Sequence, residues 1–139
     1  MNLNFSHSCK LRVRYSETDQ MGYCYYGNYA QYFEVGRVEA MRSLGWSYRK
    51  MEESGVMMPV TEFSIQYKMP AKYDDELEII TYIKKISGVR IEFYYEIYNQ
   101  NTNLICFGTT ILVFMNNLNR KPIPTPSDFK EALLSYQVI

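Results

Sequence analysis

Apolar and polar residues alternate along much of this chain, and one long segment departs from that alternation. The first alternating run covers residues 9–15, where Leu11, Val13 and Tyr15 are separated by arginines. A period of two indicates a strand with one buried face, so a strand is predicted over Cys9–Tyr15. The residues before it lack this pattern, and we expect a frayed N-terminal arm that contains the single histidine, His7.

Between Asn28 and Leu44 the period changes to that of a helix. Apolar or small residues recur every three or four positions and form one stripe: Tyr29, Tyr32, Phe33, Gly36, Ala40 and Leu44. Such a stripe predicts an amphipathic helix that packs against a sheet, and Gly45 is suited to end it. Glycine inside a helix costs about 1 kcal/mol relative to alanine. Gly36 is therefore expected where the backbone of the sheet approaches the helix closely.

Charged residues occupy other positions of the same helix. Glu34 and Arg37 are three residues apart, as are Glu39 and Arg42. Opposite charges at this spacing can form ion pairs on a helix surface. We therefore expect two such pairs along the helix.

Most of the chain after Pro59 has the pattern of strands. Four further strands are predicted, over Phe63–Lys68, Leu77–Ile83, Val89–Tyr98 and Leu104–Met115. Ser87-Gly88 is expected to form a two-residue hairpin turn. Short helices are expected over Tyr48–Ser54 and Asp128–Tyr136. One long helix and about five antiparallel strands in meander order predict a single α+β domain, with the helix against the sheet.

Apolar side chains are also predicted on the second face of this sheet. Ile80, Tyr82, Tyr94 and Tyr98 fall on the face opposite to the one that would meet the helix. A face this apolar is unusual in contact with solvent. We therefore expect this face or a sheet edge to be covered by another subunit, so that the protein is a homo-oligomer, either a dimer or a tetramer.

The charge balance and the cysteine spacing disfavour several classes of protein. Fifteen basic and fifteen acidic residues leave no net charge, so no overall field attracts nucleic acid or an anionic membrane. The three cysteines are widely spaced without a CxxC pair, which argues against a disulfide framework or a zinc site. Neither a secretory leader pattern nor a run of about 20 apolar residues is visible. A cytoplasmic protein without a metal is the expectation.

The segment between the first strand and the long helix carries the candidate chemistry. Asp19 lies in a polar turn, and Gly22 and Gly27 bracket an aromatic stretch that leads into the helix. Backbone N–H groups at a helix N-terminus lack partners and can stabilise an oxyanion. A nearby carboxylate can attack a carbonyl carbon or take a proton from water. A hydrolytic site is one interpretation, and turn or cap hydrogen bonds made by Asp19 are the alternative.

Three motifs follow one another here: Thr18-Asp19-Gln20-Met21-Gly22, Asn28-Tyr29 and Phe33-Glu34-Val35-Gly36-Arg37. In their order and spacing, and in the strands that follow, the chain resembles the 4-hydroxybenzoyl-CoA thioesterase family of hotdog proteins over roughly residues 9–116. The resemblance implies a hotdog fold, in which an antiparallel sheet wraps around one long central helix. It also implies active sites between two subunits and hydrolysis of an acyl-CoA thioester. No cofactor is implied, because coenzyme A is part of the substrate.

The same resemblance implies roles for individual residues. Asp19 matches the catalytic carboxylate, acting as nucleophile or general base. The backbone N–H of Tyr26, helped by that of Gly27, matches the oxyanion donor. Many bacterial members carry histidine at the position of Tyr26, but a backbone donor does not depend on the side chain.

Substrate contacts are expected at two places. Gly22, Tyr25 and Tyr29 are candidates beside the acyl group. The phosphates of coenzyme A need positive charge, for which the candidates around the predicted hairpin are Lys84, Lys85 and Arg90, with Arg120 and Lys121 as alternatives. A solvated hairpin end explains the first three cations equally well. An acyl-carrier-protein thioesterase and a non-catalytic acyl-CoA-binding protein are the alternative functions.

Several other residues have simpler interpretations. Glu34 lies on the helix, where another branch of hotdog thioesterases carries a carboxylate, but the ion pair with Arg37 is its expected role. Glu17 is expected in a solvated turn. Cys24 is expected to be a buried apolar residue, because no cationic partner is near it in sequence. The absence of a histidine near Asp19 disfavours dehydratase chemistry.

Overall fold

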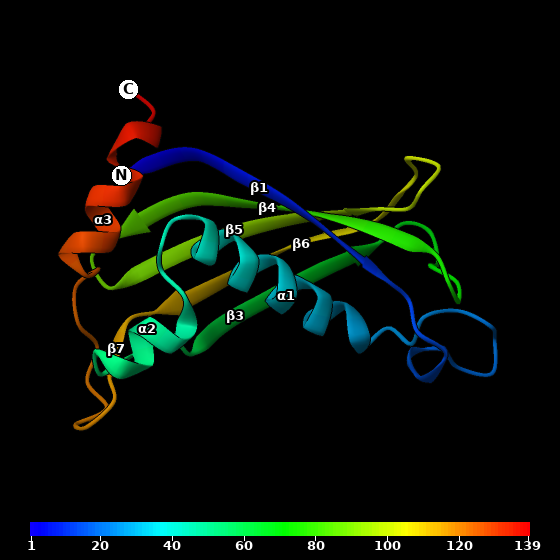
Figure 1. Ribbon diagram of the computed structural model, residues 1–139, viewed down its shortest axis with the longest axis horizontal. Helices are drawn as coiled ribbons and strands as arrows, with labels where there is room; N and C mark the ends of the chain where they lie inside the picture. Colours follow the sequence, from blue (N-terminus) through cyan, green and yellow to red (C-terminus); the bar gives the residue numbers. More distant parts are fainter.

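The core of the fold is a five-stranded antiparallel sheet, seen in a computed structural model that describes residues 1–139. Its strands are β1 (Asn2–Arg12), β3 (Val60–Tyr67), β4 (Glu76–Ser87), β5 (Arg90–Tyr98) and β6 (Leu104–Val113). A separate two-stranded sheet joins β2 (Val56–Met57) to β7 (Met115–Asn116). Helix α1 (Asn28–Ser43) lies along one face of the large sheet. Helices α2 (Tyr48–Glu53) and α3 (Ser127–Leu133) lie at the end of the sheet where the chain begins (Figure 1).

The order of the strands differs from the predicted meander. β4, β5 and β6 do follow one another, but β3 pairs with β6 and β1 pairs with β4, which gives the order β1-β4-β5-β6-β3. Because β1 occupies the outer edge of β4, the chain has to cross from β3 to β4 through residues 68–75. β3 is therefore left as an edge strand with one unpaired side.

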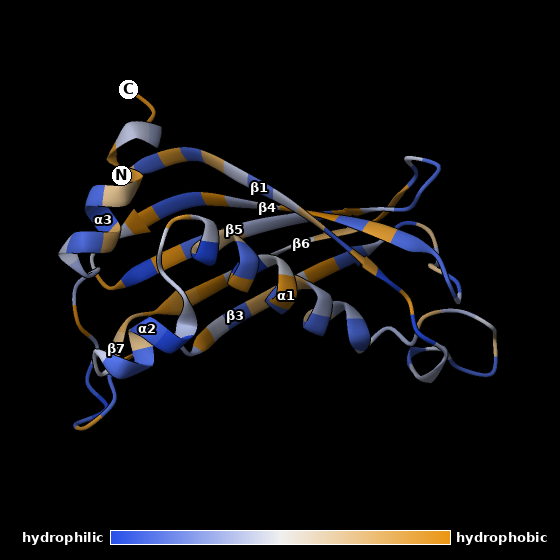
Figure 2. Cartoon of the chain, in the orientation of Figure 1, coloured by the Kyte–Doolittle hydropathy of each residue, from blue (hydrophilic) through white to orange (hydrophobic).

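The alternation of apolar and polar residues sets the two faces of the sheet, as the colour bands along the strands in Figure 2 show. The face toward α1 carries side chains with no exposed surface: Leu77, Ile79, Ile83, Ile91, Phe93, Tyr95 and Ile97. On the other face Ile80, Tyr82, Tyr94 and Tyr98 are half-buried within one chain. The predicted assignment of these residues to faces is confirmed.

The predicted long helix forms over nearly the expected range and buries the expected stripe. Tyr29, Tyr32, Phe33, Gly36 and Ala40 are all buried against the sheet. Gly45 follows the helix with φ of +82°, a left-handed conformation that glycine adopts without a steric cost. The ion pair expected between Glu39 and Arg42 is present.

The other expected ion pair, between Glu34 and Arg37, is absent, so this prediction is wrong. Arg37 is only 7% exposed, and its guanidinium donates to the hydroxyls of Tyr48 (2.7 Å) and Tyr95 (3.0 Å). The Tyr95 hydroxyl also shares a 2.6 Å hydrogen bond with that of Thr110. Glu34 is exposed. The buried face of the helix therefore includes position 37. There, hydroxyl groups accept the hydrogen bonds of the guanidinium in place of a carboxylate.

The N-terminal arm is a strand, so the expectation of a frayed arm is wrong. β1 begins at Asn2, and His7 lies opposite Thr81 of β4. Leu3 and Phe5 are buried and anchor the arm, but two apolar residues were too short a signal to predict a strand. At its other end β1 stops at Arg12. Tyr15 therefore falls in a short 3-10 turn and is 78% exposed, instead of lying on the buried strand face.

The turn between β4 and β5 lies one residue later than predicted. The β4–β5 turn is Gly88-Val89 rather than Ser87-Gly88, because Gly88 supplies a φ of +61° at the first turn position.

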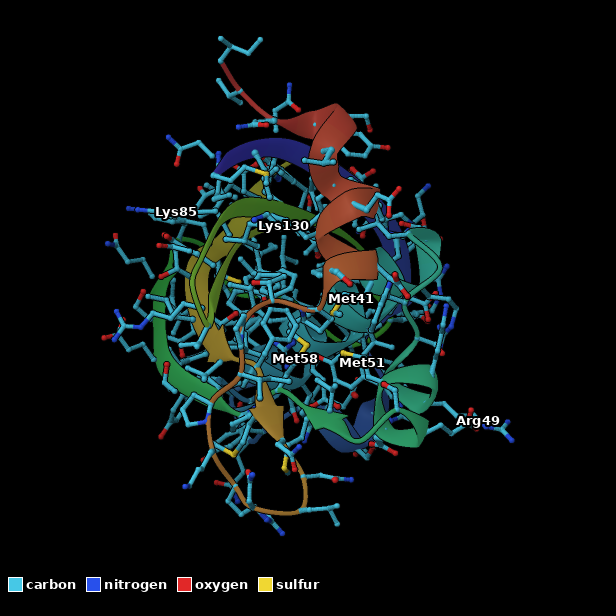
Figure 3. All side chains as sticks on the ribbon, turned by 90° about the vertical axis from the view of Figure 1, so that its left-hand side faces the viewer. Met41, Arg49, Met51, Met58, Lys85 and Lys130 are labelled. Carbon is cyan, nitrogen blue, oxygen red and sulfur yellow. The ribbon has the colours of Figure 1, made fainter.

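At the α2 end of the molecule, Met41 and Met51 point into the interior, whereas Arg49 and Lys85 extend outward (Figure 3). No helix is both long and apolar enough to cross a bilayer.

Replacing Gly36 with alanine should destabilise the protein, although alanine is the better helix former. A Cβ atom at this position would lie 2.5 Å from Thr81 Oγ1 and 2.7 Å from Ile79 Cγ2. A close approach is present as predicted, but it is made by β4 side chains and not by the sheet backbone. Overpacking of this kind costs about 1–3 kcal/mol, and we expect it to exceed the gain of about 1 kcal/mol in helix propensity.

Urea unfolding provides the measurement for Gly36→Ala. The variant should have a lower midpoint than the unmodified protein. Ala30→Gly, on the exposed side of α1, reports the effect of helix propensity alone and serves as the matched control. A midpoint for Gly36→Ala equal to or above that of the unmodified protein would contradict the close packing.

Candidate active site

The loop that carries Asp19 is a tight, internally bonded turn. The Asp19 N–H donates to the Tyr23 carbonyl at 2.9 Å, and the Gly22 N–H donates back to the Asp19 carbonyl at 3.0 Å. Gly22 has φ of +79°, which explains the need for glycine there. One carboxylate oxygen of Asp19 accepts the Met21 N–H at 2.9 Å. The second oxygen has no hydrogen-bond partner in the molecule and is free for chemistry.

The start of α1 supplies two backbone donors without partners. The N–H groups of Asn28 and Tyr29 donate to the carbonyls of Tyr25 (2.9 Å) and Tyr26 (3.3 Å). The N–H groups of Tyr26 and Gly27 donate to no acceptor within the molecule, and no side chain caps the helix at Gly27. These are the two amides proposed from the sequence as oxyanion donors. Tyr26 lines the cleft beside Asp19, whereas Gly27 does not.

Asp19 and Tyr26 line the same cleft, which has a volume of about 390 Å³. The cleft is mainly apolar, and its other lining residues are Met21, Tyr23, Cys24, Tyr29, Tyr67, Lys68, Met69 and Pro70. Such an arrangement of one carboxylate in an apolar cleft is typical of a small-molecule site.

One wall of this cleft was missed in the sequence. Tyr67, Lys68, Met69 and Pro70 come from the end of β3 and the connection to β4, about fifty residues after Asp19. The sequence signal at this place was only a strand stop at Pro70. No local pattern indicates that this stop lies beside Asp19, because the contact depends on the pairing of β3 with β6.

Aromatic rings shape the floor and rim of the cleft. Tyr67 packs edge-on against Tyr26 and lies 5.6 Å from the ring of Tyr29. The Tyr29 hydroxyl accepts the Ala71 N–H at 3.3 Å, and burial raises the pKa of Tyr29 well above its ordinary value. Tyr29 therefore stays a neutral phenol and does not serve as a base.

Tyr25 and Gly22 support the site without lining the cleft. The Tyr25 ring packs on that of Tyr26 at 4.8 Å and also covers Gly27, where a Cβ atom would lie 2.7 Å from Tyr25 Cε2. Gly22 closes the turn after Asp19. Of the three residues proposed to contact the acyl group, only Tyr29 lines the cleft.

Glu17 is buried, so the expectation that it lies in a solvated turn is wrong. It is 9% exposed, and its carboxylate accepts hydrogen bonds from the Arg14 N–H (2.8 Å) and the Tyr32 hydroxyl (3.0 Å). The turn that holds Glu17 packs onto α1 instead of projecting into water. Residues 16–20 are all polar, so the sequence pattern gave no sign that Glu17 contacts α1.

Cys24 is buried, as expected, and is poorly suited to be a nucleophile. Its thiol donates to the Tyr32 hydroxyl at 3.4 Å. Burial raises the pKa of the Cys24 thiol, so the reactive thiolate is disfavoured at neutral pH. No group of three or more His, Cys, Asp and Glu side chains could hold a metal ion.

Lys84, Lys85 and Arg90 lie at the opposite end of the sheet from the cleft. Lys85 pairs with Asn2 at the start of β1, whereas the Asp19 loop follows Arg12 at its end. Ten residues of strand span about 33 Å. A single protomer therefore does not bring these cations to Asp19. Lys84 instead lies over the rings of Tyr82 and Tyr94.

Comparison with known proteins shows the family of this chain. The sequence profile of the thioesterase-like superfamily matches residues 13–133. The chain belongs to this superfamily. The resemblance drawn from the Asp19 motif is thereby confirmed, and the five-stranded sheet with α1 on one face agrees with the hotdog fold of the thioesterases it is similar to.

Three relatives illustrate how close the superfamily members are. The putative acyl-CoA thioesterase YneP of Bacillus subtilis is 34% identical over 128 residues, which cover 92% of this chain and 93% of that protein. The chloroplastic acyl-acyl carrier protein thioesterase ATL2 of Arabidopsis thaliana is 31% identical over 134 residues, covering 94% of this chain and 70% of that one. A DHNA-CoA thioesterase from Staphylococcus aureus has a solved structure with a TM-score of 0.88 and 36% identity, covering 91% and 87% of the two chains.

Proposed function

We propose that this chain hydrolyses acyl-CoA thioesters to a free carboxylic acid and coenzyme A, with Asp19 as the catalytic carboxylate. The observation that carries the proposal is that Asp19 and Tyr26 line one apolar cleft in a chain of the thioesterase-like superfamily. A single domain accounts for this activity, since the superfamily match spans residues 13–133. The proposed reaction needs no metal or cofactor.

The chemistry follows from the unpaired groups of the site. The thioester carbonyl oxygen would accept hydrogen bonds from the backbone N–H groups of Tyr26 and Gly27. These bonds stabilise the negative charge that develops on that oxygen when the carbonyl carbon is attacked. The free Asp19 oxygen then either attacks the carbonyl carbon or removes a proton from an attacking water. In the first route a mixed anhydride forms, the C–S bond breaks, coenzyme A leaves as the thiolate, and water hydrolyses the anhydride. In the second route water supplies the new C–O bond directly.

The acyl group is proposed to occupy the apolar part of the cleft, against Tyr29 and Tyr67. Tyr29 is buried and Tyr67 is half-exposed, and the two rings meet where the start of α1 approaches the end of β3. We further propose that the sheet wraps around α1 as in other hotdog proteins. That arrangement would hold the start of the helix at the cleft.

The proposal includes a homo-oligomer in which the β3 edge meets a second copy. Val60, Phe63, Tyr67 and Met69 are 42–50% exposed along this edge and the residues that follow it. Antiparallel pairing of two β3 edges would satisfy the unpaired backbone groups and bury these side chains. Since Tyr67 and Met69 also line the cleft, the second copy would close its open side. The half-buried tyrosines of the outer sheet face offer a further surface for a tetramer.

An acyl-carrier-protein thioester is the second candidate substrate, favoured by the similarity to the Arabidopsis enzyme. Both substrates present the same thioester on a phosphopantetheine arm. The two differ in whether Lys68, the cation that lines the cleft, would meet a nucleotide or an acidic protein surface. The site chemistry proposed for Asp19 is the same for either substrate.

Asp19→Asn should lower the turnover number for an acyl-CoA by at least about 100-fold, because an amide is neither nucleophile nor base. The amide can still accept the Met21 N–H, so the loop should keep its shape. Release of free thiol over a panel of acyl-CoAs measures the rate. Glu34→Gln, which removes the other carboxylate considered above, should leave turnover unchanged.

Two outcomes would count against this assignment. Near-normal turnover of Asp19→Asn would remove Asp19 from the chemistry, and loss of activity in Glu34→Gln alone would point to the helix carboxylate instead. Stoichiometric binding of acyl-CoA by the unmodified protein without thiol release would favour a non-catalytic binding protein.

Lys68→Ala should raise the KM for an acyl-CoA by about tenfold, the loss expected for one charge-assisted contact to a phosphate. Lys68 lines the cleft, whereas Lys84, Lys85 and Arg90 of the same protomer lie far from it. The matching N-acetylcysteamine thioester lacks phosphates, so its KM should not change. Lys85→Ala is the control and should leave both KM values unchanged. If Lys85→Ala instead raised the KM for acyl-CoA alone, the phosphate contact would come from the hairpin of a partner subunit.

Sedimentation of the unmodified protein at micromolar concentration should show a dimer or a larger assembly. Phe63→Glu should shift it toward the monomer, because a charge at the β3 edge opposes its burial. Glu62→Gln, one position along the same strand, serves as the control. A purely monomeric unmodified protein would contradict the proposed assembly.

A further inference from the structure

Glu17 is a buried carboxylate that takes no part in the proposed chemistry. Its Oε1 atom accepts the Arg14 N–H at 2.8 Å and the Tyr32 hydroxyl at 3.0 Å. The only cation near it is Arg14, at 3.5 Å, and that guanidinium is 77% exposed. Burying a carboxylate is costly unless specific partners satisfy it. Its partners here belong to two different elements, the turn after β1 and helix α1.

The backbone of Glu17 makes a second set of bonds to the start of the helix. Its carbonyl accepts the Tyr25 N–H at 2.8 Å and the Asn28 side-chain amide, also at 2.8 Å. Tyr25 immediately precedes the two amides proposed to bind the oxyanion, and Asn28 is the first residue of α1. One residue therefore holds the turn before the helix through its carbonyl and the helix itself through its carboxylate.

Asp19 follows Glu17 by two residues, and the intervening Thr18 is itself tied into the turn. The Thr18 N–H donates to the Tyr15 carbonyl at 3.1 Å, and Thr18 pairs with Cys24 in an isolated bridge. Movement of Glu17 would thus move Asp19 relative to the amides of Tyr26 and Gly27. The two halves of the site are connected through this residue.

We propose that Glu17 is a positioning residue that sets the spacing between the Asp19 carboxylate and the Tyr26 and Gly27 amides. This inference rests on the proposed thioesterase function. Loss of the Glu17 carboxylate leaves the Tyr32 hydroxyl and the Arg14 N–H without their acceptor. The turn is then held to the start of α1 only through the Glu17 carbonyl, and it can shift against the helix. The cleft wall formed by Lys68 and Met69 is separate from this contact, so substrate binding is maintained while the reacting groups lose their alignment.

Glu17→Ala should lower kcat by about 30- to 100-fold and change KM by less than about threefold, because a displacement near 1 Å can cost 100-fold in rate. Glu17→Gln should restore most of the rate, since its amide oxygen can accept the same two hydrogen bonds. Tyr32→Phe removes one of the two and should give an intermediate kcat. In an Asp19→Asn background, Glu17→Ala should have little further effect on the residual rate, because the group that it positions is already lost.

Near-UV circular dichroism separates misfolding from misplacement in each variant. If Glu17→Ala does not fold, the comparison of Tyr32→Phe with Glu17→Gln decides, because Tyr32→Phe should still lower kcat without raising KM. An unchanged kcat in folded Glu17→Ala, or in Tyr32→Phe where Glu17→Ala does not fold, overturns the inference. An equal loss in kcat and binding that Glu17→Gln does not rescue also overturns it. If the unmodified protein itself releases no thiol, the proposed function fails, whereas normal turnover with an insensitive Glu17 overturns only the positioning role.

Discussion

The site depends on the docking of the β3–β4 connection onto the segment around the start of α1 through one buried residue, Ala71. The Ala71 carbonyl accepts the Cys24 N–H at 2.7 Å, and the Ala71 N–H donates to the Tyr29 hydroxyl at 3.3 Å. Ala71 has no exposed surface, so both polar groups need these partners. The cleft lies between the two segments that Ala71 joins. Together with the bridge between Tyr23 and Lys72, this contact fixes Asp19 relative to the wall formed by Tyr67 to Pro70.

A second constraint sets where the helix begins relative to the sheet. Gly36 brings α1 into close contact with Thr81 and Ile79, and Arg37 is tied to β5 through Tyr95. Close packing at the middle of the helix leaves little freedom to slide along the sheet. The start of α1 is therefore held in place relative to the sheet, and Tyr26, just before it, lines the cleft. In this way apolar packing inside the fold supports an arrangement of polar groups at its edge.

The edge strand links the proposed assembly to the proposed site. β3 is paired only with β6, and its exposed apolar side chains run into the cleft wall at Tyr67. A second copy on this edge would change the polarity of the cleft as well as its shape, since removing water strengthens the electrostatic contacts within it. The chemistry and the oligomeric state of this protein would then be coupled through one strand.

Local sequence patterns determined the helix, the inward faces of β4 and β5, and the candidate carboxylate. The buried stripe of α1 and the alternation along the strands are periodic signals that arise from packing on one face, and they survive without knowledge of the fold. The Asp19 motif was also readable, because its carboxylate and the helix start lie within ten residues of each other, but its assignment to catalysis came from the resemblance to a thioesterase family. The pairing of β3 with β6, the burial of Glu17 and Arg37, and the strand formed by the N-terminal arm were not readable. Each of these rests on partners distant in sequence, such as Tyr95 for Arg37 and β4 for the arm. Only the tertiary structure decides which distant groups satisfy a polar side chain, because charge and hydrogen-bonding capacity specify the kind of partner but not its place in the chain.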